Sequence, residues 1–278
     1  MLFRSREVDA VVQVVRCFED ENIIHVDGGI DPARDIEVIG LELIFSDLDT
    51  VARRKEKAQK MVKSGDKKYA IEGELAERLV AHLEGGTPAR TFPATKEEKE
   101  IIDSWFLLTD KPVIYAANIA EGDVDKSNAE LPFVQQVEVI AKAEGAQVFT
   151  ISARIEEEIS VMPPEEKQEF LEELGIGQSG LDRLIHACYA LLGLISFLTA
   201  GSDECRAWTI TQGTKAPQAA GKIHTDFERG FIRAEVVPFT QLMELGSMNA
   251  CRESGLIRSE GKEYVMKDGD IVLFRFNV

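Results

Sequence analysis

Two stretches of the sequence decide the fold: residues 111–121 read KPVIYAANIAE, and residues 146–156 read AQVFTISARIE. Each contains a short apolar run rich in β-branched and aromatic residues, which is typical of a buried strand. The first run ends in the turn NIAE at 118–121, and the second ends in SAR at 152–154. We therefore predict two buried strands, each followed directly by a polar turn.

These two turns are typical of G-type nucleotide-binding proteins, in which Asn-Lys-x-Asp follows one strand and Ser-Ala-Lys follows a later one. In such a site Asn118 would brace the loops and contact the N7 edge of the purine. Ile119 stands where the usual Lys covers the base, and Glu121 stands where an Asp accepts two hydrogen bonds from guanine. Because Glu is one methylene longer, we expect it to lose the main discrimination against adenine. Backbone N–H groups near Ser152 and Ala153 would then face the six-position edge of the base.

An alternative interpretation stays open, in which these are two ordinary strand-to-helix turns. The phosphate end of a nucleotide site needs G-x-x-x-x-G-K-[ST], and the sequence contains no such motif. Gly221-Lys222 is followed by Ile, and Gly261-Lys262 is followed by Glu. Base recognition would therefore lack the phosphate and Mg²⁺ contacts on which phosphoryl transfer depends.

Strands and helices alternate through the rest of the first 200 residues. An apolar run at 9–18 predicts another strand of a parallel sheet, with an unpaired edge and an exposed apolar face. Residues 31–63 and 67–83 have apolar positions at three-to-four spacing and predict a helical hairpin with a Ser64-Gly65-Asp66 turn. Further helices are predicted at 96–108, 132–144, 163–174 and 180–191, and a strand is predicted at 147–151.

Beyond Gly201 the pattern changes to short strands separated by turns that contain glycine. One helix is expected at 240–254. A small β-rich unit of this kind resembles a ubiquitin-like β-grasp. The predicted strands are 205–210, 231–237, 262–266 and 270–278.

The net charge of −17 is unevenly distributed, because residues 201–278 carry 10 Lys and Arg against 11 Asp and Glu. The acidic first part argues against broad, sequence-independent binding to nucleic acid. The sequence has no apolar run long enough to span a membrane and no signal-peptide core. Its 4 cysteines form no CxxC pair. These features predict a cytoplasmic protein with reduced thiols, no membrane partner and no metal site of its own.

Five blocks of the sequence carry a specific family resemblance: REVDAVVQVVRCFEDENIIHV at 6–26, DPARDIEVIGLELIFSDLDTV at 31–51, the NIAE turn, SGLDRLIHACYALLGLISFLTAG at 179–201, and RAWTITQGTKAPQAAGKIHTDFERGFIRAEVV at 206–237. Together they closely resemble the YchF family of Obg-like ATPases, over essentially the whole chain. The resemblance implies an α/β fold with three parts. They are a partial P-loop G-domain sheet at 1–30 and 95–200, an inserted α-helical coiled-coil hairpin at 31–94, and a C-terminal β-grasp TGS domain at 201–278.

The resemblance also implies an activity, because family members hydrolyse ATP in preference to GTP, use Mg²⁺ and associate with ribosomes. Asn118, Ile119 and Glu121 match the family's base-recognition turn, and Ser152 and Ala153 match its second base loop. The family's P-loop, switch I Thr and D-x-A-G switch II lie upstream of the REVDA block, near which this sequence begins. We therefore expect an N-terminally truncated ATPase that keeps base recognition, lacks the Mg²⁺ ligands and by itself does not hydrolyse nucleotide.

The alternative is a non-enzymatic protein that binds the ribosome or ribosomal RNA through the TGS domain and the helical hairpin. Residues 215–233 interleave basic and aromatic side chains, a pattern that contacts RNA in small β-domains. Acidic residues in the same stretch favour an ordinary solvated surface, so both interpretations stay open. The candidate RNA contacts are Lys215, Lys222, Arg229 and Arg233.

Overall fold

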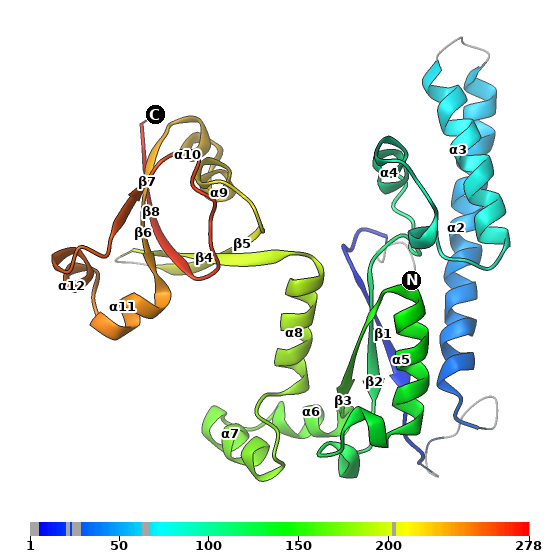
Figure 1. Ribbon diagram of the computed structural model, residues 1–278, viewed down its shortest axis with the longest axis horizontal. Coiled ribbons are helices and arrows are strands. Elements are labelled where there is room, and N and C mark those ends of the chain that lie inside the picture. Colours follow the sequence, from blue (N-terminus) through cyan, green and yellow to red (C-terminus); the bar gives the residue numbers. More distant parts are fainter. Residues whose placement is uncertain (1–5, 21–22, 24–28, 63–66, 202–203, 278) are drawn as a thin grey trace. The chain divides into compact units, whose positions relative to one another are not determined.

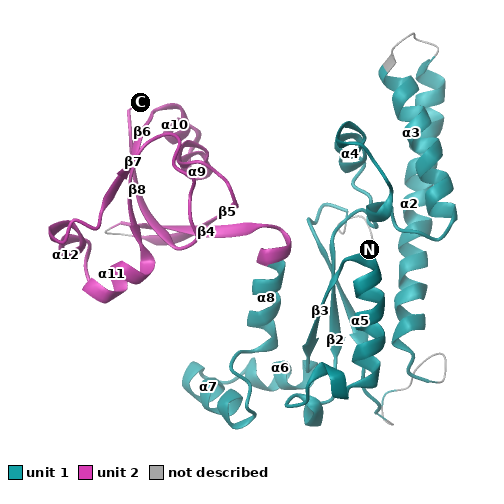
Figure 2. Ribbon diagram, in the orientation of Figure 1, with its two compact units in different colours: residues 1–188 teal, residues 189–278 magenta. Residues whose placement is uncertain are grey.

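The computed structural model describes residues 6–20, 23, 29–62, 67–201 and 204–277. The chain divides into two compact units, residues 1–188 and residues 189–278 (Figure 2). Each unit has its own β-sheet and its own hydrophobic core. Across the described ranges, no helix combines the length and the apolar character that crossing a membrane requires.

The first unit is built on a parallel sheet with the strand order β1-β2-β3 (Figure 1). β1 (Val11–Arg16), β2 (Val113–Asn118) and β3 (Gln147–Ile151) confirm the predicted parallel strands. α5 (Pro132–Glu144) packs on one face of this sheet, with Pro132 in its first turn and Gly145 at φ 68° after its last residue. The resulting core includes Val15, Tyr115, Ala117, Val134 and Val137.

β1 lies at the edge of this sheet, and in the described part of the chain it pairs with β2 alone. Its outward-facing side chains are apolar: Val12 is 36% exposed and Val14 is 66% exposed. The predicted unpaired edge and apolar face are therefore both present. Weak stability or self-association of this unit, which such an edge favours, stays a prediction.

A pair of long helices, α2 (Pro32–Val62) and α3 (Lys67–Glu84), packs side by side next to the sheet (Figure 1). Their shared core contains Val51, Leu79 and Leu83, which are at most 1% exposed. Two helices therefore occupy the predicted ranges. The predicted turn at 64–66 lies outside the described residues.

A buried carboxylate ties α2 to the segment that precedes β2. The Asp47 side chain is 0% exposed and accepts hydrogen bonds from Leu108 N at 3.0 Å, Thr109 N at 2.7 Å and Thr109 Oγ1 at 2.8 Å. Arg6 Nη1 donates to the same carboxylate at 3.0 Å. These contacts join parts of the chain that are far apart in sequence.

The helix predicted at 96–108 is shorter than expected. Thr95 begins α4 (Lys96–Asp103) with a capping box, and the helix ends at Ser104. Phe106 then adopts φ 52°, in the left-handed region, which a continuing α-helix does not allow. Trp105 and Leu107, which follow the helix, are buried in the core of the α2–α3 pair without being helical, whereas Phe106 is exposed.

A polar cluster fastens α5 to β2 and to η1 (Ala89–Thr91). Arg90 pairs with the Glu144 carboxylate, and the Tyr115 hydroxyl donates to the same carboxylate at 2.9 Å. Burial, reinforced by the negative charge of Glu144, raises the pKa of Tyr115 well above its ordinary value. The phenol therefore remains a hydrogen-bond donor throughout the neutral pH range.

Short helices complete the first unit. Those predicted at 163–174 and 180–191 are confirmed as α7 (Pro164–Glu173) and α8 (Gly180–Leu191). α6 (Ala153–Ile159), which follows β3 directly, was not expected, nor were two short 3₁₀ segments after β2. These segments are η2 (Glu121–Asp123) and η3 (Asn128–Glu130).

The second unit is a mixed sheet with the strand order β5-β4-β8-β6-β7. β4 and β8 are parallel, and the other neighbouring pairs are antiparallel. Phe197, Val236 and Phe274 are central to the core on which α9 packs. The elements are β4 (Leu194–Ala200), β5 (Cys205–Thr211), α9 (Ala216–Ile223), α10 (Thr225–Arg229), β6 (Phe231–Pro238), α11 (Phe239–Leu245), α12 (Met248–Glu253), β7 (Arg258–Glu260) and β8 (Asp270–Phe276).

Several expectations for this region were wrong. The second sheet begins before the predicted boundary at Gly201, because residues 194–200 form its strand β4. Gly193, at φ 59°, separates this apolar strand from α8. The single helix predicted at 240–254 is two helices, broken at Gly246 with φ 74°. The strand predicted at 262–266 makes only an isolated bridge between Val265 and Lys215. Helices α9 and α10 were not predicted.

Replacing Gly230 with alanine is expected to destabilise the second unit by about 1–3 kcal/mol, the usual cost of forced overpacking. A Cβ atom at this position would lie 2.0 Å from the carbonyl oxygen of Asn277 and 2.9 Å from its carbonyl carbon. These neighbouring atoms belong to the backbone directly after β8, so this backbone must shift to make room for the Cβ atom. A lower Tm would be measured by circular dichroism. Gly261→Ala is the control, since no atom lies within 4 Å of a Cβ there; equal Tm values for the two variants would contradict the prediction.

Candidate nucleotide-base site

The two predicted base loops meet at the carboxyl ends of β2 and β3. These strands are parallel neighbours, with Asn118 in register with Ile151. Ile119 N donates to the carbonyl oxygen of Ile151 at 2.9 Å, which joins the two loops where they leave the sheet. Ligands of open α/β sheets bind at this edge.

The Asn118 side chain braces the two loops. Its Oδ1 atom accepts a hydrogen bond from Ala153 N at 2.9 Å, across 35 positions of sequence. The side-chain amide group stays available as a donor for an acceptor such as purine N7. The same bond occupies the Ala153 N–H, which was predicted to face the six-position edge of the base.

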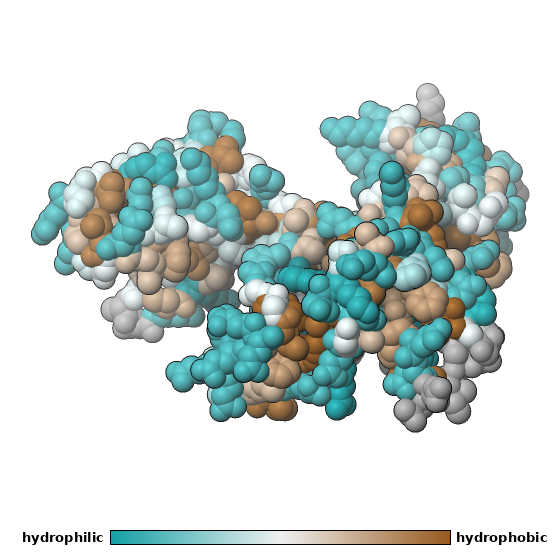
Figure 3. Space-filling view, turned by 60° about the horizontal axis from the view of Figure 1, so that its bottom comes forward, coloured by the Kyte–Doolittle hydropathy of each residue, from teal (hydrophilic) through white to brown (hydrophobic). Residues whose placement is uncertain are grey.

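A cavity of about 570 Å³ opens beside this brace. Its volume lies within the usual range for small-molecule sites, roughly 300–1,000 Å³. Figure 3 turns this lower face of Figure 1 toward the viewer and shows apolar patches among hydrophilic side chains. The lining residues are Phe18, Glu19, Asp20, Ile23, Asn118, Ile119, Ala120, Glu121, Ala153, Arg154 and Glu157.

Four of the five predicted base-site residues therefore line one cavity, but their side chains differ in how accessible they are to a bound base. Glu121 is exposed as the first residue of η2. Ile119 is only 5% exposed and packs in the core beside Val15 and Leu131, so it offers little surface on which a base could rest.

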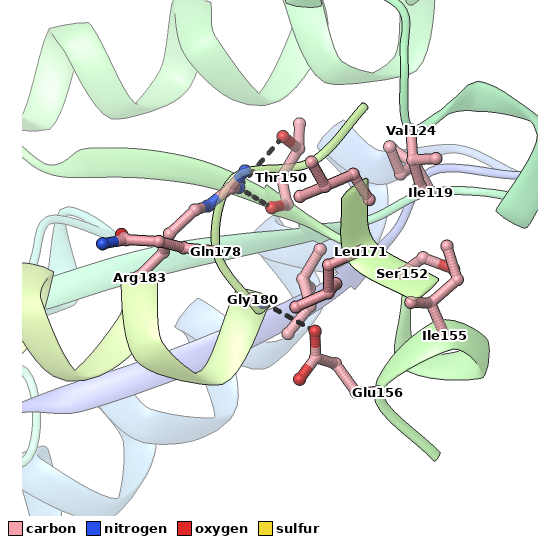
Figure 4. A pocket seen from close by; sticks show the side chains of 12 residues that line it. Ile119, Val124, Thr150, Ser152, Ile155, Glu156, Leu171, Gln178, Gly180 and Arg183 are labelled. Atoms are coloured by element: carbon pink, nitrogen blue, oxygen red, sulfur yellow. Dashed lines mark hydrogen bonds between the residues drawn. The ribbon is translucent and has the colours of Figure 1, made fainter. Parts of the chain in front are cut away.

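Ser152 is the fifth predicted residue, and it lies beneath the loop instead of facing the large cavity. Its side chain is 5% exposed, and Oγ has no hydrogen-bond partner among the described residues. It lines a second, much smaller cavity of about 30 Å³ (Figure 4).

Seven lining residues were not among the predicted site residues: Phe18, Glu19, Asp20, Ile23, Ala120, Arg154 and Glu157. Phe18 follows β1 closely, and Arg16 lies over its ring at 4.9 Å. The signal was available, because parallel strands end at the same edge and β1 ends just before this residue. Arg154 forms ion pairs with Glu158 at 3.0 Å and with Glu157 at 3.6 Å.

The four candidate RNA contacts all lie in the second unit and have different surroundings. Lys215 pairs with Glu263 at 2.5 Å, and Arg233 pairs with Glu235 at 3.1 Å. Lys222 lies in the last turn of α9, and Arg229 ends α10. Their role in RNA binding stays a prediction.

Among the described residues, no group of three or more His, Cys, Asp or Glu side chains converges on one point.

Comparison with known proteins agrees with this arrangement. Residues 194–277 match the family model YchF-GTPase_C, described as a protein of unknown function (DUF933). The ribosome-binding ATPase YchF of Bacillus subtilis is 49% identical over 278 residues, which cover 100% of this chain and 75% of that protein. Obg-like ATPase 1 of Oryza sativa subsp. japonica is 42% identical, over 100% of this chain and 70% of that protein.

A solved structure shows the same fold. The Schizosaccharomyces pombe YchF GTPase superimposes with a TM-score of 0.81 at 36% sequence identity. The match covers 99% of this chain and 74% of that one. Since the similarity extends over nearly the whole chain in both sequence and structure, this protein belongs to the YchF family.

Proposed function

We propose that this chain recognises the base of a purine nucleotide, adenine in preference to guanine, in the cavity beside Asn118 and Glu121. The observation that carries the proposal is the hydrogen bond from Ala153 N to Asn118 Oδ1, 2.9 Å long, which braces two loops at the carboxyl edge of a parallel sheet. The ATPase names of the relatives support a nucleotide ligand.

Adenine is favoured because Glu121 replaces the shorter acid that pairs with both donors of guanine. GTP would bind more weakly at the same place. The selectivity is a matter of side-chain length and position, so it is open to a direct test.

The prediction is that Glu121→Asp shifts selectivity toward guanine by at least tenfold, measured as the ratio of Kd values for ATP and GTP. A correctly placed bidentate contact discriminates between bases by roughly 1–3 kcal/mol. Fluorescence titration with labelled ATP and GTP would measure both constants. Glu173→Asp, on an exposed position of α7, is the control. Binding of wild type without preference for adenine would contradict the proposed function.

Phosphoryl transfer is not proposed for this chain alone. Its 278 residues contain no G-x-x-x-x-G-K-[ST] motif, on which the phosphate grip and Mg²⁺ binding of such enzymes depend. We infer that the chain by itself binds nucleotide weakly and does not turn it over. ATP hydrolysis by the purified chain above the background of a mock preparation would overturn this inference.

Ribosome association is the second part of the proposal, supported by the ribosome-binding names of the relatives. We assign it to the second unit, proposed as a β-grasp TGS domain, and to the α2–α3 pair, proposed as a coiled coil. A role at ribosomes implies a cytoplasmic location.

Ribosome association does not require nucleotide binding. If the chain binds no nucleotide, the alternative function is that of a non-enzymatic ribosome- or RNA-associated protein. Co-sedimentation with ribosomes at low salt tests it. Substituting Lys215, Lys222, Arg229 and Arg233 together with glutamine should release the chain if ribosomal RNA is the contact, because phosphate contacts dominate such affinity.

A further inference from the structure

The first turn of α8 lies against the loop that joins β3 to α6. Ser179 begins this helix: its Oγ accepts from Asp182 N at 3.1 Å and donates to the Asp182 carboxylate at 2.7 Å. Ser179 is 0% exposed and Gly180 is also buried. The start of α8 is therefore an internal element of the first unit.

Glu156 connects this helix start to α6. Its Oε1 atom accepts from Gly180 N at 2.6 Å (Figure 4). Its Oε2 atom accepts from Leu181 N at 3.3 Å. Unpaired backbone N–H groups at a helix start favour a carboxylate, so this contact is favourable on both hydrogen-bonding and electrostatic grounds.

Arg183 connects the same helix to β3. Its guanidinium donates to the backbone carbonyl of Thr150 and lies 3.4 Å from Thr150 Oγ1 (Figure 4). Thr150 precedes the Ser152–Ala153 turn by two residues, and Glu156 follows it by three. α8 therefore holds the turn from both sides.

The contact between α8 and β3 is closely packed at Gly180, and a small cavity lies beneath Ser152. A Cβ on Gly180 would lie 2.6 Å from Ile151 Cγ1 and 3.0 Å from Glu156 Oε1, so the helix start approaches the strand as closely as glycine permits. Beneath Ser152 lies the cavity of about 30 Å³, which side chains of β3, α6 and α8 line. Glu156 accepts hydrogen bonds from the start of α8, and Arg183 donates to β3, so these two side chains hold the loop together with the close packing at Gly180.

We propose that Glu156 and Arg183 are positioning residues of the purine site, and that purine binding is linked to the anchoring of α8. The path is continuous: Asn118 bonds to Ala153, Ala153 begins α6, and Glu156 of α6 bonds to α8. Linkage is reciprocal, so a purine that stabilises the loop also stabilises the anchor. The inference rests on the proposed base site.

Arg183→Met keeps the length of the stem and removes the donors. The expected result is at least tenfold weaker binding of labelled ATP, with Arg183→Lys restoring part of the affinity because an ammonium can still donate to the Thr150 carbonyl. Lys167→Met on α7 is the matched control. Circular dichroism melts show whether each variant folds. If Arg183→Met does not fold, the hydrogen-exchange experiment on the wild-type chain tests the proposal in its place.

In the wild-type chain, ATP is expected to slow amide exchange several-fold in peptides covering residues 179–183. If wild type binds ATP while exchange there is unchanged and Arg183→Met binds as tightly as wild type, the linkage is wrong and the base site stands. If wild type binds neither ATP nor GTP, the base site and the linkage fall together.

Discussion

Replacing Asp47 with alanine is expected to lower the free energy of unfolding of the first unit by about 3–5 kcal/mol, the typical cost of removing one partner of a buried charge pair. The carboxylate is 0% exposed and accepts from two backbone N–H groups, one hydroxyl and Arg6. Alanine would leave the N–H groups of Leu108 and Thr109 and the Thr109 hydroxyl buried without this acceptor, whereas Arg6 keeps its hydrogen bonds to Ser46. It would also detach α2 from the segment that leads into β2.

Urea unfolding followed by circular dichroism measures this loss. Asp49→Ala is the matched control, on the same helix and exposed. Asp47→Asn should fall between wild type and alanine, because one oxygen remains to accept. A loss below about 1 kcal/mol for Asp47→Ala, close to that of one ordinary hydrogen bond, would show that water replaces the carboxylate.

Replacing Asn118 with alanine is expected to weaken purine binding by roughly 10- to 100-fold, since it removes the brace to Ala153 and leaves that N–H unpaired in a loop that must hold its shape. The measurement is titration with labelled ATP. The fold should survive, because Asn118 lies at the end of its strand and is not itself in the core.

Asn118→Asp separates the two roles of this side chain. It keeps an oxygen that can accept from Ala153 N but loses the amide donor for purine N7. Binding should weaken while the Ala153 amide keeps its protection from exchange. Asn249→Ala, exposed in the second unit, is the control. Unchanged ATP affinity in both Asn118 variants would remove the base site from this cavity.

Local sequence signals predicted most of the elements of the first unit. Pro132 and Gly145 mark the two ends of α5, and the alternation of apolar runs with polar turns located β2 and β3. These signals act within a few residues, through φ restriction and capping, so they are visible without knowledge of the partners.

The second unit was predicted less well, because several of its elements depend on packing partners and not on local signals. Gly246 and Gly193 change the chain direction by adopting positive φ, a choice that depends on what each flanking segment packs against. α9 is buried through small alanines at 219 and 220, which give a weak apolar pattern in the sequence. Residues 262–266 have strand-like composition, yet β6 and β8 already pair with other strands.

For the candidate site, too, the sequence predicted one part and only the structure shows the other. The residue types at 118–121 and 152–154 predict a nucleotide base and a preference for adenine, because hydrogen-bonding groups are a property of the side chains themselves. Both stay predictions. The bond from Ala153 to Asn118, the burial of Ile119 and Ser152, and the hold of Asp47 on Thr109 came only from the folded chain. Each of these depends on long-range packing, which brings together residues whose separation in sequence carries no signal of their contact.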